Sequence, residues 1–309
     1  MSNLTILKAT TGLNTKVDPA RIKYDPNSGI GELAVAVNVD IDDTGRISRR
    51  KGFTQRVAGS FHSLFCAGDT ALCVTGDAFS ILNEGWTTTP IRNVTAGAKM
   101  SYCHVGDKIY YANGYETGYV FNRLSYAWAS STYVGPTTTR VLSDPPIGKF
   151  IEHYKGRIYI AHGDTLWYSE PYNYNTFNLH ASFIKFEGQI RMVRAVRDGL
   201  FISTDRTIYF LAGERADQGF VRLHVAPYAA FMYSDISLNG QLLYEQDGTP
   251  IIEQTQQDDA ALWLTDKGVC YGGPDGRFVN ITRNKIDLPS SLEGTSLIIK
   301  GRYIGLIEP

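Results

Sequence analysis

Short apolar runs separated by tight turns recur along most of the chain. Some of these runs alternate apolar and polar positions, and others are apolar throughout, which is typical of strands that are covered on both faces. Helical periodicity is confined at most to residues 31–37. The pattern therefore predicts an all-β protein.

One unit is repeated: an apolar strand, a tight turn containing Gly or Asp, a second strand, another turn and a third strand. Gly in such turns accepts the positive φ that a hairpin with right-handed twist requires. A degenerate copy begins at Ile236, and clear copies begin at His62, Met100, Phe150, Met192 and Ala260. The first turns of the copies are expected at Gly68-Asp69, Gly106-Asp107, Lys155-Gly156, Asp198-Gly199, Asn239-Gly240 and Lys267-Gly268.

Apolar strands that no helix covers must pack on other sheets, in a sandwich, a barrel or a propeller. Repetition of a unit of three or four strands favours a β-propeller of about six short blades, with five or seven as alternatives. We expect residues 296–309 to supply the strand pair that completes the last blade. Residues 1–55 are predicted to form an N-terminal extension or arm, or to supply a ring-closing strand, and residues 56–309 to form the propeller.

Composition supports this fold and restricts the function. Tyr and Phe are abundant, at 19 and 14 residues, and 30 Gly with 12 Pro supply many turns. The net charge is −1, whereas a domain that holds DNA by its phosphates carries a basic excess or a basic face. The short basic run of Arg46, Arg49, Arg50 and Lys51 is interpreted as a solvated hairpin end. Specific DNA binding is therefore not expected, although DNA could pass through a neutral channel.

The first residues lack the basic head and apolar run of a signal peptide, and no apolar stretch is long enough to span a membrane. We therefore expect synthesis in the cytoplasm and no membrane anchor. The four cysteines show no metal-ligand spacing and are expected to be buried free thiols. The acidic stretch 40–45 lacks the Glu that a calcium loop needs at its twelfth position, where Lys51 stands, so a hairpin turn is favoured. No metal or cofactor site is predicted.

Signatures of catalysis are missing from the sequence, which contains no G-x-S-x-G, P-loop, H-E-x-x-H or G-x-G-x-x-G motif. We therefore expect a protein that is not an enzyme. A propeller glycosidase would need two facing carboxylates, for which the candidates are Asp69, Asp107, Asp164, Glu170 and Asp205, most of them in turns.

Aromatic residues such as those at 167–174 either stack on sugars or line contacts between blades or subunits. The candidate interface residues are Arg46, Arg49, Arg50, Trp167, Tyr168, Tyr172 and Tyr174.

Several stretches together resemble one group of proteins. The N-terminal part contains Gly12-Leu13-Asn14, then Ala36-Val37-Asn38-Val39-Asp40, and then Gly45-Arg46-Ile47-Ser48-Arg49-Arg50-Lys51-Gly52-Phe53. The middle contains Gly163-Asp164-Thr165-Leu166-Trp167-Tyr168-Ser169-Glu170-Pro171. The last part contains Ala261-Leu262-Trp263-Leu264-Thr265-Asp266-Lys267-Gly268-Val269, followed by Gly272-Gly273-Pro274-Asp275-Gly276. With these motifs the chain resembles β-propeller tail proteins of tailed bacteriophages and gene transfer agents, including nozzle and hub proteins.

The resemblance implies a structural virion protein without catalytic residues, located in the phage tail as part of the nozzle or hub conduit through which DNA is ejected. It implies a cyclic homo-oligomer, six-fold as the first expectation, that contacts other tail or portal-adaptor proteins. Phage DNA would pass transiently, without specific binding. Two alternatives stay open: a receptor- or carbohydrate-binding propeller at the tail tip, and a propeller glycosidase.

Overall fold

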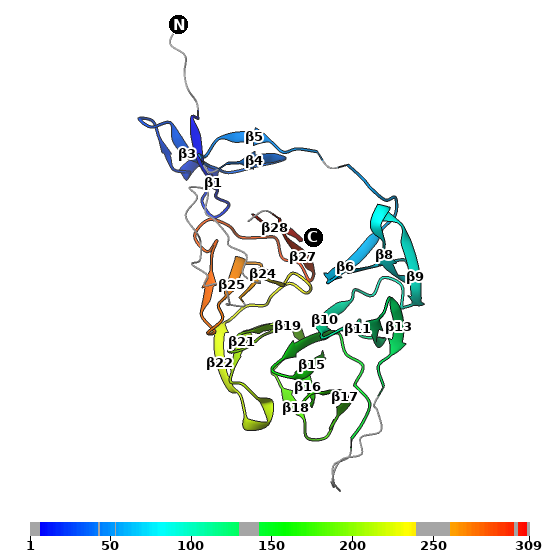
Figure 1. Cartoon of the computed structure of the whole chain (residues 1–309). Helices are drawn as coiled ribbons and strands as arrows, with labels where there is room; N and C mark the ends of the chain where they lie inside the picture. The colour runs from blue at the N-terminus through cyan, green and yellow to red at the C-terminus, as the bar shows by residue number, and fades with distance from the viewer. Residues whose placement is uncertain are drawn as a thin grey trace. The chain divides into compact units, whose positions relative to one another are not determined.

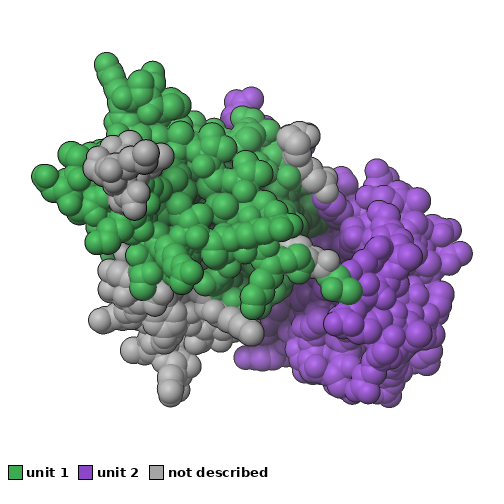
Figure 2. All heavy atoms as spheres, turned by 90° about the horizontal axis from the view of Figure 1, so that it is seen from above, with its two compact units in different colours: residues 1–54, 230–309 green, residues 55–229 purple. Residues whose placement is uncertain are grey.

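A computed structural model describes residues 7–42, 44–52, 54–129, 142–238, 260–299 and 302–307. Its contacts group the chain into two compact units (Figure 2). Unit 1 combines residues 1–54 with residues 230–309, and unit 2 consists of residues 55–229.

Unit 2 contains four antiparallel blades in which each strand pairs with the next one along the chain (Figure 1). Its described strands follow the repeat expected from the sequence. The first blade comprises β6 (Phe61–Ala67), β7 (Thr70–Thr75), β8 (Ala78–Leu82) and β9 (Thr88–Asn93), and the second comprises β10 (Ser101–Val105), β11 (Lys108–Ala112), β12 (Thr117–Phe121) and β13 (Leu124–Ala127). The third comprises β14 (Phe150–Tyr154), β15 (Arg157–His162), β16 (Thr165–Glu170) and β17 (Asn173–Phe177), with β18 (Phe183–Lys185) also paired to β16. The fourth comprises β19 (Ile190–Val196), β20 (Gly199–Thr204), β21 (Ile208–Ala212) and β22 (Val221–Ala226).

In unit 2, the tight turns between the first two strands of each blade lie where the sequence predicts them. The turn Lys267-Gly268, also predicted as a first turn, instead joins the second and third strands of the unit 1 blade, β24 (Ala261–Thr265) and β25 (Gly268–Gly272). Gly68 and Gly106 have φ of 58° and 63°, and the turn Lys155-Gly156 has two successive positive values, 45° and 74°. In the fourth blade Gly199 does not have a positive φ, and it opens β20 instead. A Cβ at Gly199 would lie 2.2 Å from the backbone oxygen of Leu211, so close packing and not turn geometry requires Gly at this position.

The core of unit 2 lies between neighbouring blades. Strand β11 shows how the two-residue period of a strand produces this arrangement. Ile109 and Tyr111 pack into the cluster shared with the first blade, while Tyr110 and Ala112 pack into the cluster shared with the third. All four side chains are at most 4% exposed. Each fully buried aliphatic or aromatic side chain contributes about 1.5–3 kcal/mol, so a strand buried on both faces stabilises two interfaces at once.

Side chains of the first strands also connect successive blades. The Ser63 hydroxyl accepts the backbone N–H of Met100 at 2.8 Å, and the Ser101 hydroxyl accepts that of Ile151 at 3.0 Å. Between the third and fourth blades, Arg194 forms an ion pair with Glu152 at 3.1 Å. The two serine hydroxyls thus accept hydrogen bonds from backbone donors of the next blade, which contributes to the pairing that buried N–H groups require.

Unit 1 contains one more four-stranded antiparallel blade, one ribbon and two small N-terminal sheets among its described residues. The blade comprises β23 (Ile236–Ser237), β24 (Ala261–Thr265), β25 (Gly268–Gly272) and β26 (Phe278–Asn280), and the ribbon comprises β27 (Gly294–Ile299) and β28 (Arg302–Ile307). The N-terminal sheets are β1 (Ala9–Leu13), β3 (Ile30–Leu33) and β2 (Tyr24–Asp25), and the hairpin of β4 (Val39–Ile41) and β5 (Ile47–Arg49). The 3-10 helices of the whole described chain are η1 (Pro19–Arg21), η2 (Glu84–Trp86) and η3 (Ala216–Gln218).

The N-terminal sheets of unit 1 are bound to its C-terminal part. The backbone N–H of Thr15 donates to the carbonyl of Lys285 at 2.8 Å, and the Lys285 ammonium donates to the carbonyl of Thr11 at 2.8 Å. Arg302 at the start of β28 reaches both carboxylate oxygens of Asp40 in β4 at 2.9 Å. The N-terminal and C-terminal residues of the chain therefore belong to one compact unit.

The all-β fold of the β-propeller class is confirmed. The described residues contain five blades, four of them four-stranded and the third with β18 as a fifth strand, and one two-stranded ribbon, against about six blades predicted. The Asn239-Gly240 turn and most of the degenerate copy lie outside the described residues. The suggestion of a helix over 31–37 is wrong, because residues 30–33 form β3, which pairs in parallel with β1. The division into an extension, 1–55, and a propeller, 56–309, stays a prediction.

The expectation that residues 296–309 supply the strand pair that completes the last blade stays a prediction. Among the described strands β27 and β28 pair only with each other. Ile298 and Tyr303 pack against the core of the β24–β25 sheet, and Gly305 lies against the Leu264 side chain. The ribbon therefore lies against a face of the blade, and the backbone N–H of Gly294 at the start of β27 also donates to the carbonyl of Met232 at 2.9 Å.

Substitution of Gly199 by Ala tests the close packing at the start of β20. We expect a loss of about 2 kcal/mol in the free energy of unfolding, because the added Cβ meets a backbone oxygen that cannot move away alone. The control is Gly68→Asn, since Gly68 has open space around it and Asn tolerates its positive φ. Urea unfolding of both variants should separate them, and equal stability would contradict the packing account.

Candidate interaction surfaces

The basic run of the sequence lies on the β4–β5 hairpin of unit 1. Arg46, Arg49 and Arg50 are all exposed. The turn before them is held by the Asp42 carboxylate, which accepts the N–H and hydroxyl of Thr44 and the N–H of Arg46 at 2.7–3.0 Å. These hydrogen bonds lower the pKa of Asp42, the one from the Thr44 hydroxyl most. The stretch is thus a hairpin turn, as expected, and its three guanidinium groups are available to a partner.

The four aromatic candidates lie in the third blade of unit 2, but the structure gives them different environments. Tyr168 is only 8% exposed. Trp167 and Tyr174 are partly buried and pack against the core shared by the second and third blades. The Tyr174 ring also stands edge-on to the ring of His153, with centroids 5.6 Å apart. These three residues therefore contribute mainly to packing within unit 2.

Tyr172 is the candidate aromatic that faces solvent, with 80% of its surface exposed. It lies in the turn between β16 and β17 and has a φ of 55°. Its N–H donates to the carbonyl of Gly156 at 2.7 Å, and its ring lies directly over Gly156, where a Cβ would come within 2.7 Å of it. The ring is thus held in one place while most of it stays open to solvent.

Beside this turn, an ion-pair network joins the third and fourth blades. The Arg157 side chain is only 5% exposed and donates to the Ser169 carbonyl at 2.5 Å. It lies 3.3 Å from Asp217, which also accepts two hydrogen bonds from Arg215 at 2.6 and 3.1 Å. The Arg215 hydrogen bonds, with a further contribution from Arg157, hold the pKa of Asp217 below its ordinary value. The network fixes the loop around η3 against the third blade.

Sequence reasoning missed one surface, the outer face of the β27–β28 ribbon. Its aliphatic side chains are paired in register, Leu297 opposite Ile304, with Leu306 and Ile299 on the same face. Their exposed fractions are 50%, 37%, 63% and 45%. The alternation of the sequence LIIKGRYIGLI indicated a strand pair but not which face would be covered, because both faces are rich in apolar residues.

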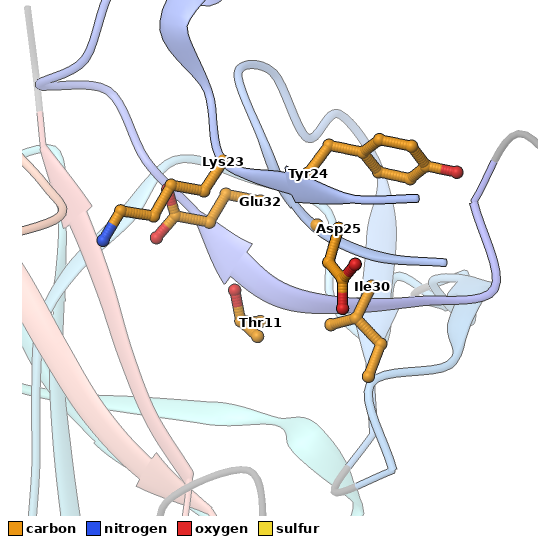
Figure 3. Close-up of a pocket in the computed structure, with 7 residues that line it drawn as sticks. Thr11, Lys23, Tyr24, Asp25, Ile30 and Glu32 are labelled. Carbon is orange, nitrogen blue, oxygen red and sulfur yellow. The ribbon is translucent and has the colours of Figure 1, made fainter. Parts of the chain in front are cut away.

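Unit 1 also has a shallow hollow of about 320 Å³ over the β1–β3–β2 sheet (Figure 3). Lys23 and Glu32 project to the same side of it, while the ring of Tyr24 points away from them (Figure 3). Its carboxylates have local roles. Glu32 accepts a hydrogen bond from Asn14 at 2.8 Å, and Asp25 accepts hydrogen bonds from Ser28 and Asn27 at 2.7 and 2.9 Å. We therefore assign this hollow to local structure.

The carboxylates considered for glycosidase chemistry lie at different ends of the blades. Asp69 and Asp107 occupy first turns, whereas Asp164 and Asp205 occupy second turns, at the opposite end of an antiparallel meander. Local hydrogen bonds engage several of them, such as the 2.6 Å bond from the Thr165 hydroxyl to Asp164. Glu170 ends β16.

Within the described ranges, no group of three or more His, Cys, Asp and Glu side chains is placed to hold a metal ion. No helix of the described residues is long and apolar enough to cross a membrane. The expectation of buried free thiols is correct for Cys73, Cys103 and Cys270 and wrong for Cys66, which is exposed.

Comparison with known proteins yields no family. No family model matches the chain, and no curated protein matches it. Among solved structures, a gluconolactonase of Xanthomonas campestris is 10% identical, with a TM-score of 0.43 over 77% of this chain and 82% of that chain. Hsv2 of Kluyveromyces lactis is 8% identical, with a TM-score of 0.38 over 85% and 75% of the two chains. PorZ of Porphyromonas gingivalis is 11% identical with a TM-score of 0.36, and the match spans only 31% of its length. Likenesses this weak carry no assignment of function.

The partial burial of His153 predicts that the free energy of unfolding of unit 2 depends on pH. Burial lowers the pKa of His153 below its usual 6.5, so the unfolded chain binds this proton first as the pH falls. The contribution of neutral His153 is therefore complete above about pH 6.5 and is lost as the pH falls towards the lower pKa of the folded state. We expect His153→Gln to reduce the loss of unfolding free energy between about pH 7 and pH 5, measured by urea titration. The control is His180→Gln at an exposed site, and equal slopes for both variants would contradict the prediction.

Proposed function

We propose that this protein is a structural, non-enzymatic component of a phage tail that acts by protein–protein assembly. In this proposal it forms a ring of identical copies around the tail axis and contacts other tail or portal-adaptor proteins. Phage DNA passes through without specific binding. The protein is located in the virion after its synthesis in the host cytoplasm.

The observation that carries the proposal is the outer face of the β27–β28 ribbon. Exposed aliphatic side chains gather on one face of a short sheet, whereas scattered single apolar residues are the norm on protein surfaces. The opposite face of the ribbon packs into the unit 1 core, so the aliphatic face is presented by a fixed element. A fixed apolar face on a protein surface favours a role in assembly.

Three further features support a role in assembly over a role in catalysis. Blades that share buried cores with their neighbours resist deformation, as a conduit wall must. The sequence motifs that resemble tail proteins include the Gly45–Phe53 stretch, part of which forms the β4–β5 hairpin with its exposed guanidinium groups. A net charge of −1 suits a channel that releases DNA, because a strongly basic wall would retain it.

The direct test is to purify tailed particles from the source of this chain and to measure its copy number by quantitative mass spectrometry. Antibody labelling with electron microscopy would locate it. We expect about six or twelve copies per particle on the tail axis, as one or two six-fold rings would contain. Absence from the particles would contradict the proposal. About three copies at fibre tips would favour receptor binding, and release of sugars from a polysaccharide panel would favour a glycosidase.

A further inference from the structure

Two exposed aromatic residues of unit 2 occupy backbone conformations that disfavour them. Trp86 is 54% exposed with a φ of 69°, and Tyr172 is 80% exposed with a φ of 55°. The left-handed region favours Gly or Asn, and a bulky residue there costs free energy that the fold must supply. Tyr172 makes one backbone hydrogen bond, to Gly156, but neither exposed ring fills the core. Large aromatic side chains held in a strained conformation on the surface point to a function for the two side chains.

Both residues lie in equivalent positions of the repeat. Trp86 is in the connection between the third and fourth strands of the first blade, and Tyr172 is in the same connection of the third blade. In an antiparallel meander this connection lies at the same end as the first turn, so both exposed residues lie at the same end of their blades. A hydrogen bond from Arg123 to Asn83 ties the corresponding connection of the second blade to that of the first.

The positions of Trp86 and Tyr172 in different blades set a minimum size for a ligand that contacts both. Because Trp86 lies in the first blade and Tyr172 in the third, a ligand that contacts both side chains must extend across three blades. A protein surface is large enough to do this, whereas a mono- or disaccharide is too small. Tyr and Trp are also the side chains most enriched among residues that dominate protein–protein binding. The charged groups near Tyr172 are largely paired with one another, so the partner surface that fits is mainly apolar.

The same chain carries such a surface in unit 1, the aliphatic face of Leu297, Ile299, Ile304 and Leu306. We infer that the Trp86–Tyr172 end of unit 2 in one copy binds the aliphatic ribbon face of unit 1 in the next copy. The inference rests on the proposed function, whose ring of identical copies it extends to a specific contact. Two unlike surfaces that bind each other give a head-to-tail contact, which closes into a ring when the rotation between copies allows it.

A complementation experiment tests this contact, with sedimentation velocity of the wild-type chain as reference. One variant carries Trp86→Asn and Tyr172→Asn, which relieve the backbone strain. The other carries Leu297→Thr and Leu306→Thr, which retain strand propensity. We expect each variant to melt at the wild-type temperature or above and to self-associate at least tenfold more weakly than the wild type. A 1:1 mixture should form dimers, because one intact surface of each kind remains.

Matched controls alter exposed residues outside the two surfaces. Tyr115→Asn replaces a 65% exposed aromatic at the opposite end of the blades, and Val221→Thr replaces a 62% exposed aliphatic residue in β22. Both controls should assemble as the wild type does. A monomeric wild type, unchanged assembly of either double variant, or a mixture that stays monomeric would overturn the inference.

Two results separate this inference from the proposed function. If the double variants still enter tail particles as rings, the head-to-tail contact is wrong and the structural role stands. If Trp86→Asn with Tyr172→Asn abolishes binding to a glycan array while self-association is unchanged, the aromatic end recognises carbohydrate and the inference is wrong.

Discussion

The burial of both faces of each sheet is the constraint on which the rest of unit 2 depends. With only three short 3-10 helices in the described chain, no helix covers a sheet, so each blade must be covered by the next one. Strand β11 contributes Ile109 and Tyr111 to one core and Tyr110 and Ala112 to the next. The hydroxyls of Ser63 and Ser101 then satisfy backbone donors where the first strands of the blades meet.

In this architecture the interior side chains form the cores between blades, so functional residues are expected in the turns, at the sheet edges and on the ribbon. The surfaces that stand out are those that local folding does not require. Tyr172 and Trp86 bear backbone strain without filling a core, and the outer face of β27–β28 exposes aliphatic side chains on an element whose other face is fixed. In unit 1, Arg302 of the ribbon also binds Asp40, and this contact attaches the basic β4–β5 hairpin to the ribbon.

The sequence predicts the blades because their signals are local. Turns such as Gly68-Asp69 and Lys155-Gly156 lie between alternating apolar runs, and the structure places them there. The exposure of a side chain, in contrast, cannot be predicted from its sequence neighbours alone, because it depends on which other strands pack against it. The run TLWYSE presents Trp167 and Tyr168 to opposite faces of β16, and only the neighbouring strands decide that Tyr168 is buried while Tyr172, four residues later, is exposed. For the same reason, the sequence indicated the strands of the ribbon but not its uncovered face, nor the packing that requires Gly199.

The central claim is that this chain works by assembling with copies of itself. The most direct measurement is the mass of the purified full-length chain in solution over a range of concentrations, by light scattering coupled to gel filtration. The account predicts a closed species of about six copies that does not grow further as concentration rises, since a ring leaves no surface of either kind unfilled. A monomer at every concentration would contradict it.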